Sequence, residues 1–221
     1  MRGKPTYPSY TPSMFIDPEA PASHKRTLYT AMVAPRPIGW ISTLAPDGSA
    51  NLAPFSYFNL VSSAPPIVMF VGNQPTDRLE KDTIANARVS GEFVYNLSTV
   101  PLAAQMVATA TGTARGVDEF VLAGLEKATC LKVRPPRVAA SPLAFECMVE
   151  RIVDIEGRTA DEGRSSVVFG RVVGVHVADR LIGPTGRFDT LGAQPLCRLG
   201  GAQYAAIGEI FEITSPYKPS A

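Results

Sequence analysis

The sequence is poor in the residues that build metal centres and disulfide frameworks. Its 221 residues include only three cysteines, Cys130, Cys147 and Cys197, and two histidines, His24 and His176. The cysteines are odd in number and far apart, which argues against a disulfide framework and against a cysteine metal cluster. We therefore expect free thiols in a reducing compartment and no metal site.

Charge and hydropathy disfavour two further classes of protein. The net charge is +1 with no long basic or acidic run, so nothing favours binding to nucleic acid or to an anionic membrane. No apolar run is long enough to span a bilayer, and residues 1–13 lack the apolar core of a signal peptide. These features predict a cytoplasmic protein without a nucleic-acid or membrane partner.

Common nucleotide and hydrolase motifs are also absent. The chain has no Gly-x-Gly-x-x-Gly after a predicted strand, no Gly-x-x-x-x-Gly-Lys-Ser/Thr and no Gly-x-Ser-x-Gly. A Rossmann dinucleotide site, a P-loop and a serine-hydrolase elbow are therefore not supported. Because no pair of acid and base side chains stands out either, the sequence favours chemistry that is carried by an organic cofactor.

The distribution of proline and glycine points to a β-rich fold. The chain has 20 prolines and 18 glycines between runs of β-branched residues, a pattern typical of strands joined by turns. Long strands and short helices predict a mainly β protein built as a closed or nearly closed antiparallel barrel. We expect an N-terminal arm at 1–20 and one domain at 21–221. Strands are predicted at 39–45, 50–56, 67–71, 92–97, 144–155 and 166–178, and short helices at 84–88, 101–110 and 118–123.

One stretch carries an unusual mixture of hydroxyl, amide and aromatic side chains. Two strand-like runs, 36–43 and 51–59, flank a turn at Asp47-Gly48. A flat, phosphorylated ligand needs apolar walls for its ring and hydroxyl or N–H donors for its phosphate. Further on, Lys81 precedes a predicted helix whose N-terminus would direct free N–H groups toward an anion. The two segments together suit flavin mononucleotide (FMN).

The predicted FMN site draws its residues from these two segments. Hydroxyls and amides would meet the phosphate and the pyrimidine edge, and small or rigid residues would let the backbone approach the ring. No side chain is predicted to be catalytic, since hydride transfer between two stacked rings needs orientation rather than a base. The predicted cofactor-binding residues are Arg36, Pro37, Gly39, Trp40, Ile41, Ser42, Thr43, Asn51, Ala53, Pro54, Ser56, Phe58, Asn59, Lys81, Asp82 and Thr83.

Several residues have a simple structural alternative. Trp40 could equally be a core aromatic, and Asp82 could act as the N-cap of the following helix. Arg36 could hold the pyrimidine edge, a phosphate or a structural carboxylate. His176 shares a strand face with two glycines, which would let a backbone or ligand approach; it could face a nicotinamide pocket or a subunit interface, and we favour the interface.

Taken in order along the chain, these segments resemble the flavin reductase-like family of FMN-binding split barrels. The resemblance rests on residues 36–43, 51–58, 81–83 with Asn86, 92–97, 146–147, 170–173 and 198–201 with Tyr204. It implies a six-stranded antiparallel Greek-key split β-barrel and a homodimer with FMN near the subunit interface.

The resemblance also implies an activity. Members of the family often reduce FMN with NADH or NADPH, and some supply the reduced flavin to a monooxygenase. The resemblance therefore implies an NAD(P)H-dependent FMN reductase with a possible monooxygenase or electron-transfer partner. The alternative is a non-catalytic FMN electron carrier of the flavoredoxin type. The charged loop 157–164 departs from the family pattern, and we expect it to be dispensable for FMN binding.

Overall fold

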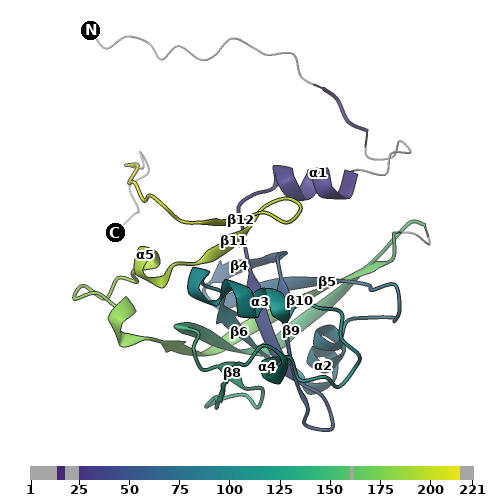
Figure 1. The fold of residues 1–221 in the computed structure, drawn as a ribbon, viewed down its shortest axis with the longest axis horizontal. Coiled ribbons are helices and arrows are strands. Elements are labelled where there is room, and N and C mark those ends of the chain that lie inside the picture. Colours follow the sequence, from purple (N-terminus) through teal and green to yellow (C-terminus); the bar gives the residue numbers. More distant parts are fainter. Residues whose placement is uncertain (1–13, 18–24, 160–161, 215–221) are drawn as a thin grey trace.

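An antiparallel sheet of seven strands forms the body of the protein, as the computed structural model in Figure 1 shows. The structure describes residues 14–17, 25–159 and 162–214. All neighbouring strands of the sheet pair antiparallel. In sheet order they are β3 (Ala50–Phe55), β2 (Gly39–Leu44), β6 (Glu92–Leu97), β9 (Leu143–Glu156), β10 (Arg164–Val177), β5 (Pro66–Asn73) and β4 (Phe58–Ser63).

The two outermost strands of this order are consecutive in the chain. Only Ser56 and Tyr57 separate β3 from β4, and the N–H of Val71 in β5 donates to the Tyr57 carbonyl at 2.9 Å. β3 and β4 therefore act as one bent segment that pairs with β2 at one end and with β5 at the other. Counted in this way, the sheet closes as a barrel of six strands, and the predicted mainly β, antiparallel split barrel is confirmed.

The long strands β9 and β10 follow directly from the sequence pattern. Each has 14 residues, and their observed bounds differ from the predicted ones by two residues at most. Both are rich in β-branched residues and contain no proline, so they pair over most of their length. Glycine in β10 serves packing: a Cβ added at Gly170 would lie 2.2 Å from the ring of Phe93.

The hydrophobic core has two parts that lie on opposite sides of β2. Ile41 belongs to a cluster with Phe70 and Phe93, whose rings meet edge to face at 5.1 Å. Trp40 points to the other side, into a second cluster that includes Met106 and is covered by short helices. The alternation of neighbouring side chains along a strand accounts for this division.

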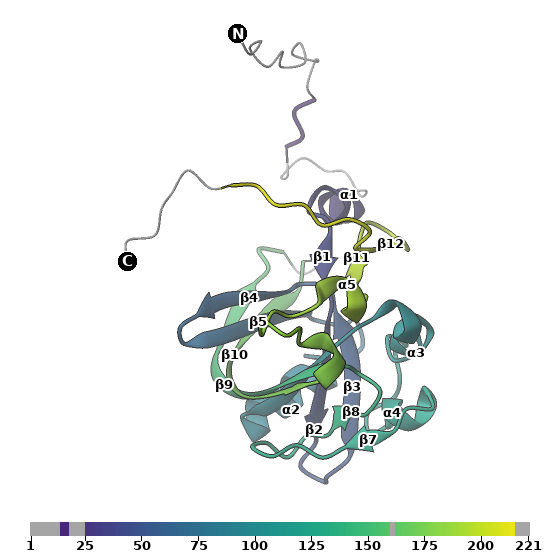
Figure 2. The ribbon, with the colours of Figure 1, turned by 90° about the vertical axis from the view of Figure 1, so that its left-hand side faces the viewer.

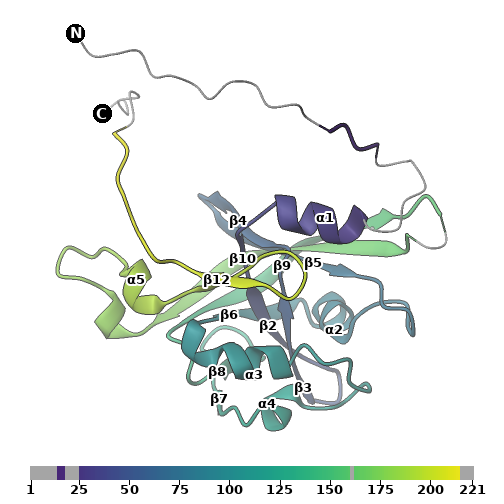
Figure 3. The ribbon, with the colours of Figure 1, turned by 45° about the horizontal axis from the view of Figure 1, so that its top comes forward.

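Short helices and two small sheets surround the barrel. Helix α1 (Lys25–Met32) lies beside β11 (Leu196–Arg198) and β12 (Tyr204–Ala206) at one end, and α2 (Asp82–Ser90) and α4 (Glu119–Leu122) lie at the opposite end (Figures 2 and 3). No helix of the described residues is long and apolar enough to cross a bilayer. The remaining elements are β1 (Arg36–Pro37), a 3-10 turn (Val100–Leu102), α3 (Ala103–Ala108), β7 (Lys127–Ala128), β8 (Arg137–Val138), a second 3-10 turn (Asp179–Leu181) and α5 (Thr190–Ala193).

Of two further expectations, the structure contradicts one and leaves the other untested. The predicted role of Asp82 as N-cap is wrong: Lys81 is the N-cap, and Asp82 is the first helical residue. The carboxylate of Asp82 is engaged by two arginines instead, as described below. The predicted arm at 1–20 lies outside the described residues except for 14–17, so this division of the chain stays a prediction.

Candidate functional site

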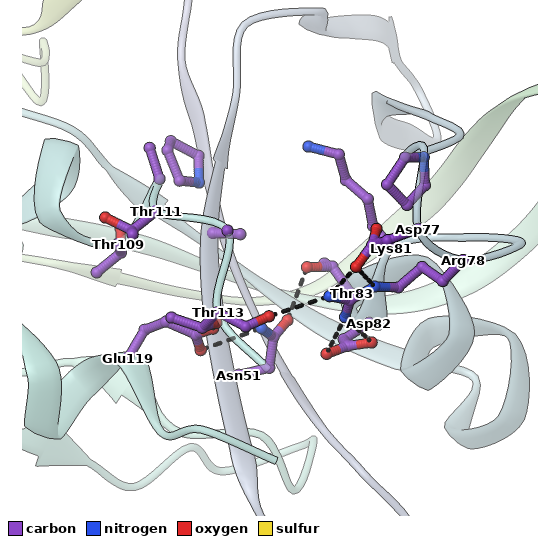
Figure 4. Close-up of a pocket in the computed structure, with 15 residues that line it drawn as sticks. Asn51, Asp77, Arg78, Lys81, Asp82, Thr83, Thr109, Thr111, Thr113 and Glu119 are labelled. Carbon is purple, nitrogen blue, oxygen red and sulfur yellow. Dashed lines mark hydrogen bonds and ion pairs between the residues drawn. The ribbon is translucent and has the colours of Figure 1, made fainter. Parts of the chain in front are cut away.

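A cavity of about 390 Å³ opens between strand β3, the start of α2 and the loop 109–113 (Figure 4). We call it the β3 cavity. Its volume lies within the range of small-molecule sites in proteins. In Figure 4, Asp77, Arg78 and Lys81 stand on one side of the hollow and Thr109 and Thr111 on the other. The lining residues are Asn51, Ala53, Pro54, Pro75, Asp77, Arg78, Lys81, Asp82, Thr83, Thr109, Ala110, Thr111, Gly112, Thr113 and Glu119.

Lys81 supplies an ammonium group without an acidic partner. Within the described residues it forms no ion pair, and its Nζ lies 5.5 Å from the centroid of the Phe55 ring. Although the residue is exposed, desolvation of the ammonium by the surrounding protein lowers the pKa of Lys81 below its ordinary value. A charged group that is partly desolvated and unpaired gains from an anionic ligand.

The start of α2 adds N–H donors beside this ammonium. Lys81 has no side-chain oxygen that could cap the helix, and no side-chain cap bond is formed. The first N–H groups of a helix have no intrahelical partner, and the helix dipole favours negative charge there. The N–H of Gly112 across the cavity also makes no hydrogen bond within the described part of the chain. The cavity thus offers donors from two sides.

Asp82 holds two arginines beside the cavity. Its carboxylate lies 3.2 Å from Nη1 of Arg78 and 3.1 Å from Nε of Arg115. Arg78 also pairs with Asp77 at 2.8 Å and donates to the Thr113 carbonyl at 3.0 Å. Both arginines are therefore already matched by acidic groups, which leaves Lys81, among the described residues of this cavity, as the cation without an acidic partner.

A buried polar network fixes the floor of the cavity. Asn51 Nδ2 donates to Glu119 Oε2 at 3.1 Å, while its Oδ1 accepts from the hydroxyls of Thr83 at 2.7 Å and Thr43 at 3.3 Å. Glu119 also accepts from the Leu52 N–H at 2.9 Å. Because the Thr83 hydroxyl donates to Asn51, it offers an added ligand lone pairs in this arrangement rather than a hydrogen, while the buried Thr43 oxygen already accepts from Asn86 Nδ2 at 3.1 Å.

Six of the sixteen residues predicted to bind the cofactor line this cavity. Thr43 is not part of the cavity lining, but its hydroxyl donates to Asn51, which is. Ser56 and Asn59 lie on either side of the bend between β3 and β4, outside the cavity lining. The six that line it are Asn51, Ala53, Pro54, Lys81, Asp82 and Thr83.

Of the remaining predicted residues, Pro37 is exposed and the others pack inside the protein. Trp40 is fully buried, and its Nε1 donates to Thr109 Oγ1 at 2.9 Å, which favours the core role over that of a cofactor wall. Gly39 lies so close to Phe58 that an added Cβ would be 2.5 Å from its ring. Ile41, Ser42 and Phe58 are buried as well, and Pro37 pairs with Cys197 in the small sheet.

Arg36 binds backbone carbonyls, and no carboxylate among the described residues pairs with it; a contact with the pyrimidine edge or the phosphate of a flavin stays a prediction. Its guanidinium donates to the Leu199 carbonyl at 2.8 Å and to the carbonyls of Thr30 and Val33. It therefore ties the end of α1 to the C-terminal segment. The ring of Tyr57 lies over the same guanidinium, with 5.9 Å between centroid and Cζ.

Comparison with known proteins places the chain in a family. Residues 32–192, more than half of the chain, match the family model described as flavin reductase like domain. The chain belongs to the flavin reductase-like family. An uncharacterized protein of Aquifex aeolicus is 33% identical over 88% of this chain and 96% of its own.

Two solved structures extend this likeness. Nitrilotriacetate monooxygenase component B from Bacillus cereus is 32% identical with a TM-score of 0.86, covering 92% of this chain and all of that one. The 2-nitrobenzoate 2-nitroreductase NbaA of Pseudomonas fluorescens is 27% identical with a TM-score of 0.80, covering 95% and 100%. The family and its split-barrel fold, expected from the order of the segments, are thereby confirmed.

The sequence analysis missed part of the candidate site in this flavin reductase-like protein. The run Thr109-Ala110-Thr111-Gly112-Thr113 carries a local signal, since threonines alternate there with small residues. Glu119 carries none, because its partners Asn51 and Leu52 lie 68 and 67 residues away. Arg78 looks like an ordinary surface arginine until its distances to Asp77 and Asp82 are known.

Proposed function

We propose that this protein is an FMN-binding flavin reductase that passes a hydride from NADH or NADPH to FMN. The observation that carries the proposal is the unpaired ammonium of Lys81 at the start of α2, on the wall of the β3 cavity. In this proposal the cavity takes the FMN phosphate. Membership of the flavin reductase-like family supports a flavin as the ligand.

The phosphate would rest between the two sets of donors. Lys81 would supply the charge, and the free N–H groups at the start of α2 and at Gly112 would supply directed hydrogen bonds. The Asp82 carboxylate would keep Arg78 and Arg115 in place without contacting the phosphate itself. Bound FMN would supply the hydride-accepting chemistry, so the chain needs to bind and orient rather than to move protons.

The ring would lie along β3, away from α2. Ala53 and Pro54 form a small, rigid part of the cavity wall against which a flat ring can pack. Ser56 and Asn59 follow at the bend and would meet the polar edge of the ring. We keep all sixteen predicted residues as the proposed site, with Trp40, Ile41 and Phe58 supporting it from within the core.

A partner and a second copy complete the proposal. Similarity to a protein described as nitrilotriacetate monooxygenase component B supports supply of reduced flavin to a monooxygenase. The homodimer is proposed from the likeness of the chain to the flavin reductase-like family. The free thiols of the three cysteines are compatible with the cytoplasm.

Anaerobic reduction tests the proposal. The protein is reconstituted with FMN, NADH or NADPH is added without oxygen, and the visible flavin absorbance is followed. Rapid bleaching by either nucleotide is the expected result and gives the nucleotide preference. If FMN binds but stays oxidised, the reductase proposal is wrong and an electron carrier of the flavoredoxin type is favoured instead. Failure to bind FMN would refute the proposal as a whole.

A further inference from the structure

A second cavity, of about 440 Å³, lies beside β8 and the C-terminal end of β10. We call it the β8 cavity. It shares no lining residue with the β3 cavity, so it is a separate site. Two of its residues are basic or can become so, Arg137 and His176. The lining residues are Arg137, Ala139, Ser141, Pro142, Val175, His176, Val177 and Ala178.

Arg137 is half-buried on the wall of this cavity without a partner. Its guanidinium makes no ion pair and no hydrogen bond within the part of the chain that the structure describes. Its Nε is buried and unsatisfied, which is uncommon for a polar atom in a folded protein. The guanidinium as a whole is only partly buried, so a ligand oxygen that enters the cavity would supply the acceptor that it lacks.

The backbone around Arg137 is held firmly in place. β8 pairs with β7, Arg137 opposite Ala128. The N–H of Val138 donates to Asn96 Oδ1 at 2.8 Å, and the N–H of Ala139 donates to the Glu126 carbonyl at 3.0 Å. Arg137 is therefore presented by a pre-organised segment, as a specific binding site requires.

The nearby carboxylate of Glu146 does not neutralise Arg137. It accepts from the N–H groups of Leu131 and Val133 at 2.9 and 3.0 Å and from that of Lys132, and His176 Nε2 lies 2.6 Å from its Oε1. Its lone pairs are thus already engaged by backbone donors and by the imidazole. His176 is bonded to Glu146, and its expected place at a nicotinamide pocket or a subunit interface stays a prediction.

The same residues also raise the possibility of a metal, which the contacts disfavour. The Cys130 sulfur, a Glu146 oxygen and a His176 nitrogen lie within 4.8 Å of one another. Glu146, however, is surrounded by N–H donors that a cation would have to displace. Burial, and then the charge of Glu146, raise the pKa of the Cys130 thiol to about 11, so the thiolate that a metal needs is disfavoured.

We propose that the β8 cavity is a second binding site that takes a small oxyanion, a carboxylate or a phosphate, on the Arg137 guanidinium. The planar guanidinium presents paired donors that match both groups. His176 lines the same cavity, and its Nδ1 has no partner among the described residues. An anion bound at Arg137 would therefore change the surroundings of the His176 ring. The proposal does not depend on the flavin assignment.

Histidine NMR tests this proposal, because the chain contains only two histidines. The FMN-saturated protein, labelled with ¹³C in its histidine rings, is titrated with sodium acetate and separately with sodium phosphate. Ionic strength is kept constant with sodium chloride, and pH is kept at 7.5. The His176→Gln variant assigns the His176 signal, and the His24 signal serves as the internal reference. A saturable shift of the His176 signal alone is the expected result.

Variants assign the shift to Arg137. Arg137→Gln should weaken the titration about tenfold or more, since it removes a charge-assisted hydrogen bond. Arg187→Gln, which removes an exposed arginine elsewhere, should leave it unchanged. If Arg137→Gln does not fold, Arg137→Lys is used, and it should weaken the titration because it loses the paired donors. Saturation by one anion only would identify the source of the oxyanion. No saturable shift with either anion, or equal affinity in the folded Arg137 variant, would overturn the proposal.

Discussion

Replacing Lys81 by methionine should weaken binding of FMN much more than binding of riboflavin, which lacks the phosphate. Lys81 forms no ion pair within the described residues, so the substitution frees no buried acid. Its side chain makes no capping bond to α2 either. In the unliganded protein the substitution also removes a partly desolvated charge, so the melting temperature should stay the same or rise slightly.

The size of the effect follows from the contact that is lost. A charge-assisted hydrogen bond contributes about 1.5–3 kcal/mol, and solvent around this exposed side chain reduces the figure to about 1–2 kcal/mol. We therefore expect the dissociation constant for FMN to rise roughly 5- to 30-fold. The difference should shrink as salt is added, because exposed charges are screened.

Quenching of flavin fluorescence during titration with protein measures both dissociation constants. Lys132→Met is the matched control, because Lys132 is an exposed lysine that does not line the β3 cavity. The reasoning is refuted if Lys81→Met weakens riboflavin as much as FMN, since the lost contact would then not be with the phosphate. It is refuted as well if neither ligand is affected.

Four further predictions concern pH and packing. Because desolvation lowers the pKa of Lys81, the ammonium should lose its proton, and wild-type protein its affinity for FMN, as pH rises toward the ordinary lysine value of 10.5. The FMN affinity of Lys81→Met should not fall in this way, and fluorescence titrations across pH test the difference. Glu119→Gln sets an amide where Asn51 and Leu52 donate and should lower the free energy of unfolding by about 1–3 kcal/mol in urea titrations, whereas a loss under 0.5 kcal/mol would contradict the network. Gly170→Ala forces a methyl group against Phe93 and should cost about 1–3 kcal/mol of stability with FMN affinity unchanged; a change in affinity would show that the barrel interior and the site are coupled. Burial raises the pKa of Glu146, but hydrogen bonds from Leu131, Lys132, His176 and Val133 outweigh burial, so the net pKa is lowered. The ionised carboxylate therefore stabilises the fold above the ordinary pKa of 4.5, and this contribution is lost as pH falls through the lowered pKa. The stability gap between wild type and Glu146→Gln should therefore narrow below pH 4.5, and a gap that stays constant in acid unfolding curves would contradict this.

The two long strands could be predicted well because their signal is local, whereas β4 (Phe58–Ser63) was not predicted. β9 and β10 are uninterrupted runs rich in β-branched residues, and their bounds agree with prediction to within two residues. The turn before β3 is likewise local: Gly48 has a φ of 85°, and the Ser49 N–H donates to Asp47 Oδ1 at 2.9 Å. In each case, residues adjacent in the sequence determine the conformation.

The start of α2 shows where a local pattern is insufficient. Asp82 has the side chain of a good N-cap, yet it lies inside the helix and binds Arg78 and Arg115. Arg115 is 33 residues away in the sequence. An ion pair across that separation competes with capping, and only the folded chain decides which one forms.

The sequence by itself determined the mainly β architecture, the order of the segments that marks the flavin reductase-like family, and the presence of Lys81 before a helix. These depend on periodicity, turn residues and the order of segments, which can be read from residues close together in the sequence. The tertiary structure decided that Trp40 packs in the core, that Glu119 orients Asn51, and that Arg137 shares a second cavity with His176. Those contacts join residues far apart in the chain. They exist only because antiparallel pairing and barrel closure bring distant strands together, and no local pattern encodes that distance.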